Sequence, residues 1–384
     1  MTKWTSTILR WTLSSAAFAA VIASAACSSK PAPQPVAKAP EVPLAPADPF
    51  SLPVSSAVNQ FGEFDGAGPT SVNPVGMSGY QQHSFIEEGF DSAVTLDPSG
   101  KWLLYSSTRH SEHPDIYLQR TDGLAVQKLT EDPSDDAFPV FSPGGKQIAF
   151  CSNRSGIWQI YMMDLDGKNV TQLTSGTMQC VHPSFSPDGM KLVYSSLGAR
   201  SNQWELWTLD LNTNEKRQIG YGLFPTWCPD PKQSKIAFQR ARQRGSRWFS
   251  LWTLELQDGD ARHLTEIAVS SNAAIVSPAW SPDGKRLAFA TIVEPMMRAG
   301  KKTIAQQDIW TVNIDGTNRQ RLTDGNGKNL SPAWAADNRI FFISDRSGFE
   351  SIWSVPAQQG DMFTASSGKK TEAVSTTYTH YVAK

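Results

Sequence analysis

A few histidines and arginines are the residues in this chain whose types and spacing could support chemistry. His110 and His113 lie three positions apart, and Asp115 follows two positions later. Two imidazoles and a carboxylate at this spacing could hold one divalent metal ion. The alternative is an exposed polar loop between two strands, and we favour it.

Signatures of common enzyme classes are missing from the sequence. The segment Gly76-Met77-Ser78-Gly79 does not fit the Gly-x-Ser-x-Gly nucleophile elbow of hydrolases. Neither a His-Glu-x-x-His zinc motif, nor a phosphate-binding loop, nor a dinucleotide fingerprint occurs. We therefore expect a protein that is not an enzyme and that uses no cofactor and no metal.

A short turn phrase repeats along the chain and defines the elements that hold these residues. Ser-Pro-Gly-Gly-Lys at 142–146, Ser-Pro-Asp-Gly-Met at 186–190 and Ser-Pro-Asp-Gly-Lys at 281–285 each precede an apolar run. Degenerate copies lie at residues 97–101, 228–232 and 335–339. The spacings of roughly 40 to 50 residues are those of propeller blades with four strands each.

Each repeat predicts the same order of strands. In the second repeat, an inner strand at 138–141 is followed by the turn, a second strand at 147–151, an aromatic-rich third strand at 158–163 and an outer strand at 170–174. Aromatic residues recur in the third strands, where we expect core between blades rather than platforms for sugars. The predicted fold class is all-β, a six-bladed β-propeller of four-stranded blades.

These repeats resemble the TolB family of periplasmic six-bladed propellers. The Ser-Pro-Asp-Gly-Lys turn, the following Ile-Ala-Phe run, the strand at 160–167 (Ile-Tyr-Met-Met-Asp-Leu-Asp-Gly) and the closing Gln-Leu-Thr carry the resemblance over roughly residues 85–365. It implies docking of a peptidoglycan-associated lipoprotein. The chain departs from the family in having a Pro-rich segment where TolB has an N-terminal α/β domain.

One inner-strand position suggests a contact site at the channel mouth. His182 occupies this position in the third repeat, and Phe138, Phe224, Ser277 and Ser331 are its equivalents. This mixture resembles a rim that contacts a partner more than a cage of metal ligands. We therefore predict that His182, Phe138 and Phe224 contact a partner.

Two basic loops provide a second candidate surface. The loop after the second strand of blade four carries Arg240, Arg242, Arg244 and Arg247, and a long insertion in blade five, from 291 to 307, carries Arg298, Lys301 and Lys302. On a chain with a formal net charge of −1, such loops could steer an acidic partner. The near-neutral total charge argues against general binding of nucleic acid.

The N-terminus has the features of an export signal. Lys3 and Arg10 precede an apolar stretch that reaches Ala26 and is too short for a membrane span. Ser24-Ala25-Ala26-Cys27 resembles a bacterial lipobox, in which Cys27 is lipidated, although ordinary cleavage after Ala25 also fits. A Pro-rich tether follows, and extended polyproline II conformation would make it a semi-rigid spacer.

These features predict three regions and a location. Residues 1–26 form the signal peptide, residues 27–84 the lipidated Cys27, tether and irregular lead-in, and residues 85–384 the propeller. Residues 54–84 either pack onto the domain or supply a strand that closes it. The protein would lie in the periplasm, anchored to the outer membrane through Cys27.

The sequence does not determine whether the internal cysteines form a disulfide. Cys151, Cys180 and Cys228 allow at most one internal disulfide, and Cys151 and Cys180 are candidates to lie near each other. Isolated buried thiols are the alternative, and we favour them.

Together these observations predict a binding scaffold in the cell envelope. Its partner would be a peptidoglycan-associated or other envelope protein, without nucleic acid. The alternatives are a structural subunit of a larger envelope complex and a carbohydrate lyase or hydrolase with a channel site.

Overall fold

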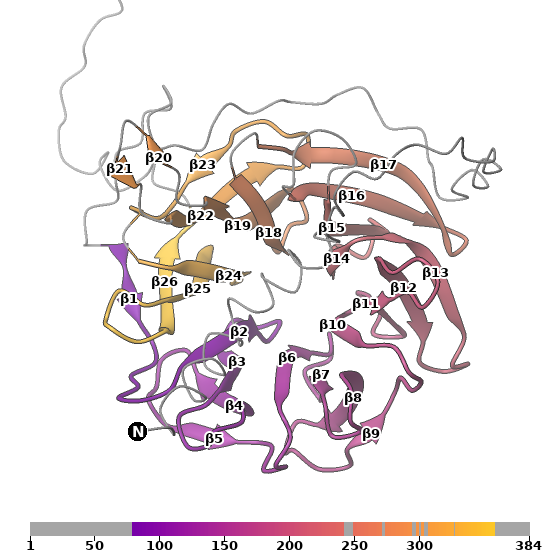
Figure 1. The fold of residues 1–384 in the computed structure, drawn as a ribbon, viewed down its shortest axis with the longest axis horizontal. Coiled ribbons are helices and arrows are strands. Elements are labelled where there is room, and N and C mark those ends of the chain that lie inside the picture. Colours follow the sequence, from indigo (N-terminus) through magenta and orange to yellow (C-terminus); the bar gives the residue numbers. More distant parts are fainter. Residues whose placement is uncertain are drawn as a thin grey trace, which may run out of the picture.

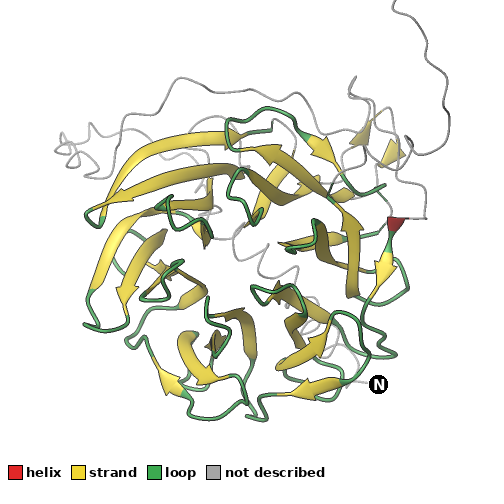
Figure 2. Ribbon diagram, turned by 180° about the vertical axis from the view of Figure 1, so that it is seen from behind, coloured by secondary structure: helices red, strands yellow, loops and turns green. Residues whose placement is uncertain are grey.

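The protein is a ring of six β-sheets arranged like propeller blades around a central axis (Figures 1 and 2). The structure, a computed structural model, describes residues 79–241, 249–270, 273–293, 297–298, 301–302, 306–325 and 327–357. Each of the six sheets has four antiparallel strands, as the sequence predicted. None of the described helical residues could span a membrane. Cys27 and the Pro-rich tether lie outside the described residues.

The first five blades follow the chain in order. Blade one contains β2 (Asp91–Leu96), β3 (Trp102–Ser107), β4 (Asp115–Arg120) and β5 (Val126–Lys128). Blade two contains β6 (Asp136–Phe141), β7 (Gln147–Ser152), β8 (Gln159–Asp164) and β9 (Thr171–Gln172). Blade three contains β10 (Cys180–Phe185), β11 (Lys191–Leu197), β12 (Trp204–Asp210) and β13 (Lys216–Tyr221). Blade four contains β14 (Leu223–Trp227), β15 (Lys235–Ala241), β16 (Phe249–Gln257) and β17 (Asp260–Ala268).

Blade five carries an extension, and blade six closes the ring. Blade five contains β18 (Ala273–Trp280), β19 (Arg286–Val293), β22 (Gln306–Asn313) and β23 (Gln320–Arg321), and between β19 and β22 lies a small pair, β20 (Met297–Arg298) and β21 (Lys301–Lys302). Blade six contains β24 (Asn329–Trp334), β25 (Arg339–Ser344) and β26 (Ser351–Pro356). Its outer strand is β1 (Gln81–Gln82), so the N-terminal segment completes the last blade, visible in Figure 1 as indigo β1 beside yellow β26.

Two details differ from the sequence prediction. The closing strand lies ahead of residue 85, where the prediction began the propeller, and it realises the second of the two roles considered for residues 54–84. In blade five the predicted insertion is partly regular, because β19 and β22 remain paired as far as Val293 and Gln306.

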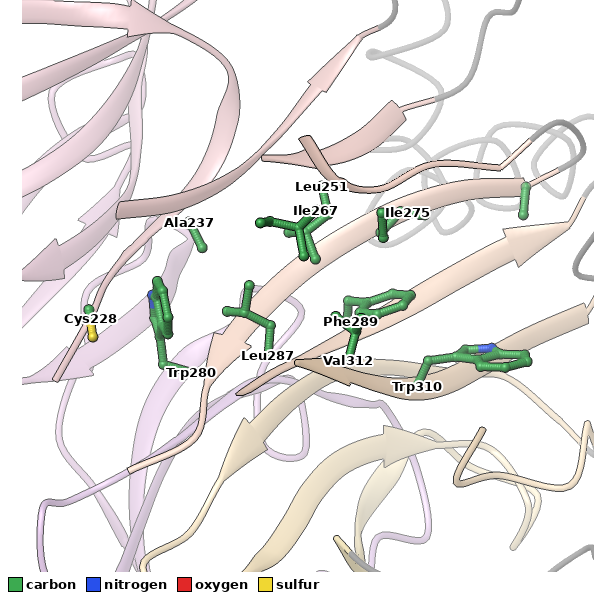
Figure 3. Close-up of a cluster of buried hydrophobic side chains, with 12 residues drawn as sticks. Cys228, Ala237, Leu251, Ile267, Ile275, Trp280, Leu287, Phe289, Trp310 and Val312 are labelled. Carbon is green, nitrogen blue, oxygen red and sulfur yellow. The ribbon is translucent and has the colours of Figure 1, made fainter. Parts of the chain in front are cut away.

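The hydrophobic core lies between blades rather than in one centre. Among the described residues, six separate clusters of buried side chains each draw on two neighbouring blades. In the cluster between blades four and five, Trp280 lies beside Cys228 (Figure 3). Apolar residues on both faces of the second strands, such as β3, β7 and β25, are therefore buried, because each blade is covered on two sides. The aromatic residues of the third strands join these clusters, as predicted.

Candidate functional site

Every inner strand contains a one-residue bulge at the same place. In blade two, Ala137 pairs with Cys151 and Val140 with Ala149, so three steps along β6 match two steps along β7. The same shift occurs in the other five blades. The bulge residue has φ between 50° and 56° in each case, and the six are Ala93, Phe138, His182, Phe224, Ser277 and Ser331.

The sequence accounts for the bulges. Five of the six bulge residues precede a proline, which lacks an N–H and is tolerated in a strand only at an edge or a bulge. Left-handed backbone at a residue with a side chain costs about 1–3 kcal/mol, and it persists where surrounding structure over-determines it. Bulges redirect side chains, and here they direct six equivalent side chains toward the channel.

The bulge residues form one boundary of a central cavity of about 530 Å³. From the bulges, its wall continues through the ends of the inner strands to the turn prolines Pro98, Pro143, Pro187, Pro229 and Pro282. Pro98, Pro229 and Pro282 are exposed, so the cavity opens on the face that carries the repeated turns. Inner-strand residues on the other side of the bulges, such as Ala137 and Val181, do not line it.

The cavity has an aromatic side and a side of small residues. His182 stacks on Phe224 with ring centroids 3.7 Å apart, and Phe138 meets His182 edge-on at 4.5 Å. Around the ring, the equivalent positions in blades five, six and one are Ser277, Ser331 and Ala93. The structure thus brings His182, Phe138 and Phe224 together, as their equivalent positions in the repeats predicted.

A second tier of large side chains lies nearer the turns. Three residues after each bulge, the inner strand contributes an apolar residue to the cavity wall: Leu96, Phe141, Phe185, Trp227, Trp280 and Trp334. Trp280 donates its indole Nε1–H to the carbonyl oxygen of Thr226 in the neighbouring blade, at 2.9 Å. This hydrogen bond connects the cavity wall across the boundary between blades four and five. The aromatic rings of this tier make the wall rigid.

The cavity wall contains few titratable side chains. Among the described residues, Asp97 and His182 are the titratable side chains in its wall. Burial lowers the pKa of His182 to about 3, so its imidazole is neutral near pH 7. The Asp97 carboxylate accepts hydrogen bonds from the N–H groups of Lys101 and Trp102 at 2.8 and 2.7 Å, which caps its own turn. No acid–base pair therefore faces the cavity from the described residues.

Arg240, the first residue of the predicted basic loop in blade four, lies at the end of the blade opposite the cavity. In blade four, the Trp227 end of the inner strand pairs near Ile236, whereas Leu223 pairs with Gln239, next to Arg240. The guanidinium of Arg240 lies 5.6 Å from the ring centroid of Trp252. Arg242, Arg244 and Arg247 lie outside the described residues, as do the side chains of Arg298, Lys301 and Lys302 on β20 and β21. Arg240 therefore lies apart from the cavity that His182, Phe138 and Phe224 line.

The histidines of blade one have separate partners. His113 Nδ1 lies 2.7 Å from a carboxylate oxygen of Asp135, and the His110 ring contacts Tyr117 edge-on at 6.1 Å. Asp115 is buried and forms an ion pair with Lys128 at 2.9 Å. Within the described ranges, His, Cys, Asp and Glu side chains form no group of three or more that could hold a metal ion.

The internal cysteines are buried free thiols. Cys151 and Cys180 share the cluster between blades two and three, and Cys228 lies in the cluster between blades four and five. Burial raises the pKa of the Cys151 thiol. These thiols are therefore protonated packing groups in this structure rather than nucleophiles.

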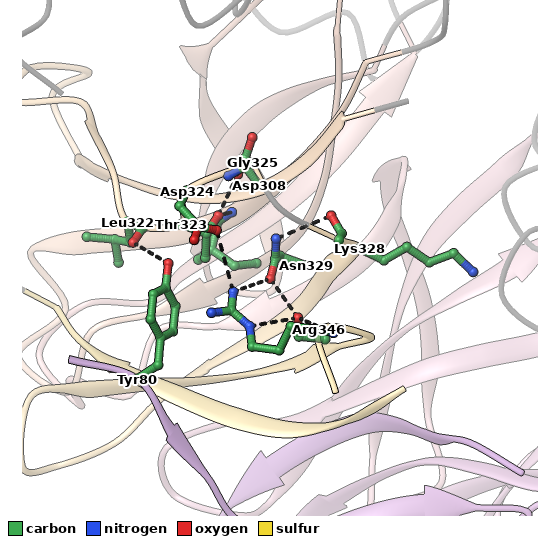
Figure 4. A network of polar contacts seen from close by, with 12 residues as sticks. Tyr80, Asp308, Leu322, Thr323, Asp324, Gly325, Lys328, Asn329 and Arg346 are labelled. Carbon is green, nitrogen blue, oxygen red and sulfur yellow. Dashed lines mark hydrogen bonds and ion pairs between the residues drawn. The ribbon is translucent and has the colours of Figure 1, made fainter. Parts of the chain in front are cut away.

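From the sequence we did not predict a polar network that recurs in blades one, two and six, in which an arginine bonds a buried serine and a buried carboxylate or amide. Arg154 donates to both carboxylate oxygens of Asp136 at 3.1 and 3.0 Å, and its Nε–H donates to Ser152 Oγ at 2.9 Å. Arg109 makes the same contacts with Asp91 and Ser107. In blade six, Arg346 bonds Asn329 and Ser344 (Figure 4). The Ser-x-Arg sequence at the end of the second strand, shared by these three blades, could have indicated this network.

Comparison with known proteins agrees with this fold. The TolB beta propeller domain model matches residues 76–233. The Tol-Pal system protein TolB of Bordetella pertussis is 27% identical over 148 residues, which cover 29% of this chain and 34% of that protein. TolB of Alcanivorax borkumensis is 32% identical over 88 residues, covering 23% of this chain and 18% of that protein. The predicted resemblance to TolB propellers is confirmed.

Other matches show that this fold serves several functions. Dipeptidyl-peptidase 5 of Porphyromonas gingivalis is 36% identical over 87 residues, covering 22% of this chain and 12% of that protein. The chain thus spans only a minor part of the curated relatives it matches. A gluconolactonase from Xanthomonas campestris superposes with a TM-score of 0.52 at 11% identity, over 72% of this chain and 89% of that one. An oligogalacturonate lyase from Vibrio parahaemolyticus gives 0.50 at 14% identity, over 73% and 94%. These two structures share the fold.

Proposed function

We propose that this chain, which carries a TolB-like six-bladed β-propeller, is a non-catalytic docking scaffold of the cell envelope. Its partner would be an envelope protein such as a peptidoglycan-associated lipoprotein, since the TolB relatives are Tol-Pal system proteins. The expected export signal and lipidation of Cys27 would hold the scaffold at the outer membrane in the periplasm.

The central cavity is the observation that carries this proposal. Its volume of about 530 Å³ fits a few inserted side chains, and its aromatic and small hydroxyl-bearing walls are uncharged apart from Asp97. Preformed pockets with rigid aromatic walls are where partner side chains bind most strongly. Catalysis by a lyase or hydrolase instead needs a positioned base, acid or metal. His182, neutral and stacked on Phe224, supports binding rather than proton transfer.

A titration with purified peptidoglycan-associated lipoprotein tests this docking role. Trp227, Trp280 and Trp334 line the cavity, so insertion of a partner should change the tryptophan fluorescence of the full chain. A Phe138→Ser, Phe224→Ser double variant should weaken binding by about tenfold or more, because both rings would leave the wall. Val170→Ser, at an exposed position outside the cavity, is the matched control.

Each other outcome points to an alternative. Unchanged affinity of the double variant would contradict docking in the cavity. Equal losses in the double variant and the control, together with stable co-purification of several envelope proteins, would favour a structural subunit of a larger complex. Turnover of a polysaccharide by the purified chain would favour the lyase or hydrolase reading instead.

We propose a separate, electrostatic role for the basic loops. Because Arg240 lies at the end of its blade away from the cavity mouth, these loops would steer an acidic surface rather than extend the cavity. Changing Arg242, Arg244 and Arg247 to Gln should lower the association rate and its salt dependence. A control triple variant at Lys168, Lys216 and Arg262, three exposed cations on or beside outer strands, should leave both unchanged. Equal effects of the two triple variants would rule out a specific role for the loops.

A further inference from the structure

The ring is closed by a very short strand. In β1 only Gln81 and Gln82 pair with β26, opposite Ser354 and Trp353. Two paired residues supply few backbone hydrogen bonds between the ends of the propeller. Closure therefore also depends on the contacts of the residues next to this strand.

His83 connects the first blade to the last. Its side chain is buried, with 6% of the residue exposed, and its ring packs 4.6 Å from the ring centroid of Phe341 in blade six. Its Nδ1 lies 3.1 Å from the carbonyl oxygen of Thr121, directly after β4 of blade one. Its Nε2 lies 2.8 Å from Ser354 Oγ in β26. One imidazole thus contacts both sides of the seam.

The partners determine which form of the imidazole fits. A carbonyl oxygen only accepts hydrogen bonds, so Nδ1 carries the hydrogen and donates it to Thr121. Ser354 Oγ accepts from Arg339 Nε at 3.0 Å and Nη2 at 2.8 Å, and guanidinium nitrogens cannot accept. The Ser354 hydroxyl hydrogen is therefore donated to His83 Nε2. This arrangement requires the neutral ring.

The backbone of the segment depends on the same seam. The His83 carbonyl oxygen accepts a hydrogen bond from Gln119 Nε2 of blade one at 2.7 Å. Its N–H donates to the Ile352 carbonyl oxygen at 2.9 Å, and the Ile352 N–H donates to Ser84 Oγ at 2.7 Å. Tyr80, next to β1, donates to the Leu322 carbonyl oxygen at 3.5 Å (Figure 4). Displacement of His83 would disturb all of these contacts.

We propose that His83 is an acid-sensitive latch: its neutral imidazole holds the propeller ring closed, and its protonation releases residues 79–84 from blades one and six. A proton on Nε2 would place an N–H against Ser354 Oγ, whose hydroxyl hydrogen would then lose its acceptor. It would also place a second cation beside the Arg339 guanidinium. This proposal is independent of the docking role of the cavity.

The groups around His83 determine whether acid stabilises or destabilises the closed ring. Burial, assisted by repulsion from Arg339, lowers the pKa of His83, while the Thr121 carbonyl and the Asp337 carboxylate oppose the shift. The contacts from blade one are an uncharged carbonyl and an uncharged amide. The closed state therefore disfavours the proton. Its stability is fully present above the ordinary histidine pKa of about 6.5 and is lost as pH falls below that value.

Hydrogen exchange of the His83 and Ile352 amides in the full chain tests the latch. Once corrected for intrinsic exchange, their protection should fall by up to about tenfold between pH 7.5 and 5.5, because opening takes up one proton. His83→Asn keeps polar side-chain groups but cannot titrate, and should abolish this dependence whether the segment stays closed or opens at every pH. His83→Gln is a second variant with the same expectation.

The control is His110→Asn, at an exposed histidine of blade one. This variant should keep the full pH dependence at both amides. Protection that stays constant from pH 7.5 to 5.5 in the unmodified chain would overturn the proposal. So would a His83→Asn variant that retains the original slope.

Discussion

The guanidinium of Arg154 lies 3.0 Å from the carboxylate of Asp136, which is completely buried at the start of β6. The guanidinium also sits over the aromatic rings of Phe150 and Tyr161, at 5.5 and 5.0 Å from their centroids. A buried carboxylate is costly unless it is paired. This pair therefore fixes where the inner strand of blade two begins, close to the bulge at Phe138.

Removal of Arg154 should destabilise the propeller strongly. Arg154→Met leaves the Asp136 carboxylate buried without its cation, and we expect a loss of about 3 kcal/mol in the free energy of unfolding, measured by denaturant titration. Asp136→Asn should cost less, because blade six uses Asn329 with Arg346 in the same arrangement. A loss in Arg154→Met no larger than in Asp136→Asn would contradict this expectation.

The hydrogen bond from Trp280 to Thr226 should contribute to cohesion between blades four and five. Trp280→Phe keeps an aromatic ring but removes the N–H donor, and we expect a loss of about 1 kcal/mol in the free energy of unfolding. Trp227→Phe is the control, because the described residues provide no hydrogen bond to the Trp227 indole. Losses of equal size would attribute the effect to packing alone.

His182 should make the propeller sensitive to acid without titrating near neutral pH. Its pKa in the folded protein is about 3, below the unfolded value of about 6.5, so stability is retained above pH 6.5 and lost as the pH falls toward 3. Between pH 7 and 4 the unmodified chain should lose about 3 kcal/mol more than His182→Phe. Denaturant titrations at both pH values measure this difference, and parallel losses would contradict it.

The left-handed backbone at the bulges should discriminate between side chains of similar size. At Ser277, where φ is 52°, Ser277→Val should destabilise the protein by about 1–3 kcal/mol, since a β-branched residue is strained there. Ser277→Asn should be close to neutral, because Asn tolerates this region. Thermal unfolding of both variants is the measurement. A valine variant as stable as the asparagine variant would mean that the bulge relaxes.

Much of the architecture was readable from local pattern. The Ser-Pro-Asp-Gly turns at 186–189 and 281–284 mark the ends of inner strands, and the apolar runs after them became β11 and β19. The equivalence of His182 with Phe138 and Phe224 followed from repeat spacing, and their meeting follows from ring symmetry. Lipidation of Cys27 and the contacts of Arg242, Arg244 and Arg247 stay predictions.

Other features could not be read from spacing. The closing role of Gln81 and Gln82 depends on contacts across some 270 residues of sequence, which no local pattern encodes. The arginine of each Ser-x-Arg segment was visible, but its buried carboxylate or amide partner lies on another strand. The face on which the cavity opens could not be read from spacing either, and Arg240 lies at the other end of blade four.

By itself, the sequence determined the six repeats, their four-strand order and the equivalence of five inner-strand positions, because turns, prolines and alternation of apolar residues act within a few residues of each other. Only the tertiary structure decided how the ring closes, on which face the cavity opens, and that His182 and His83 are buried as neutral rings. These properties arise from desolvation and hydrogen bonds between segments far apart in the chain, and such interactions exist only once the blades have packed.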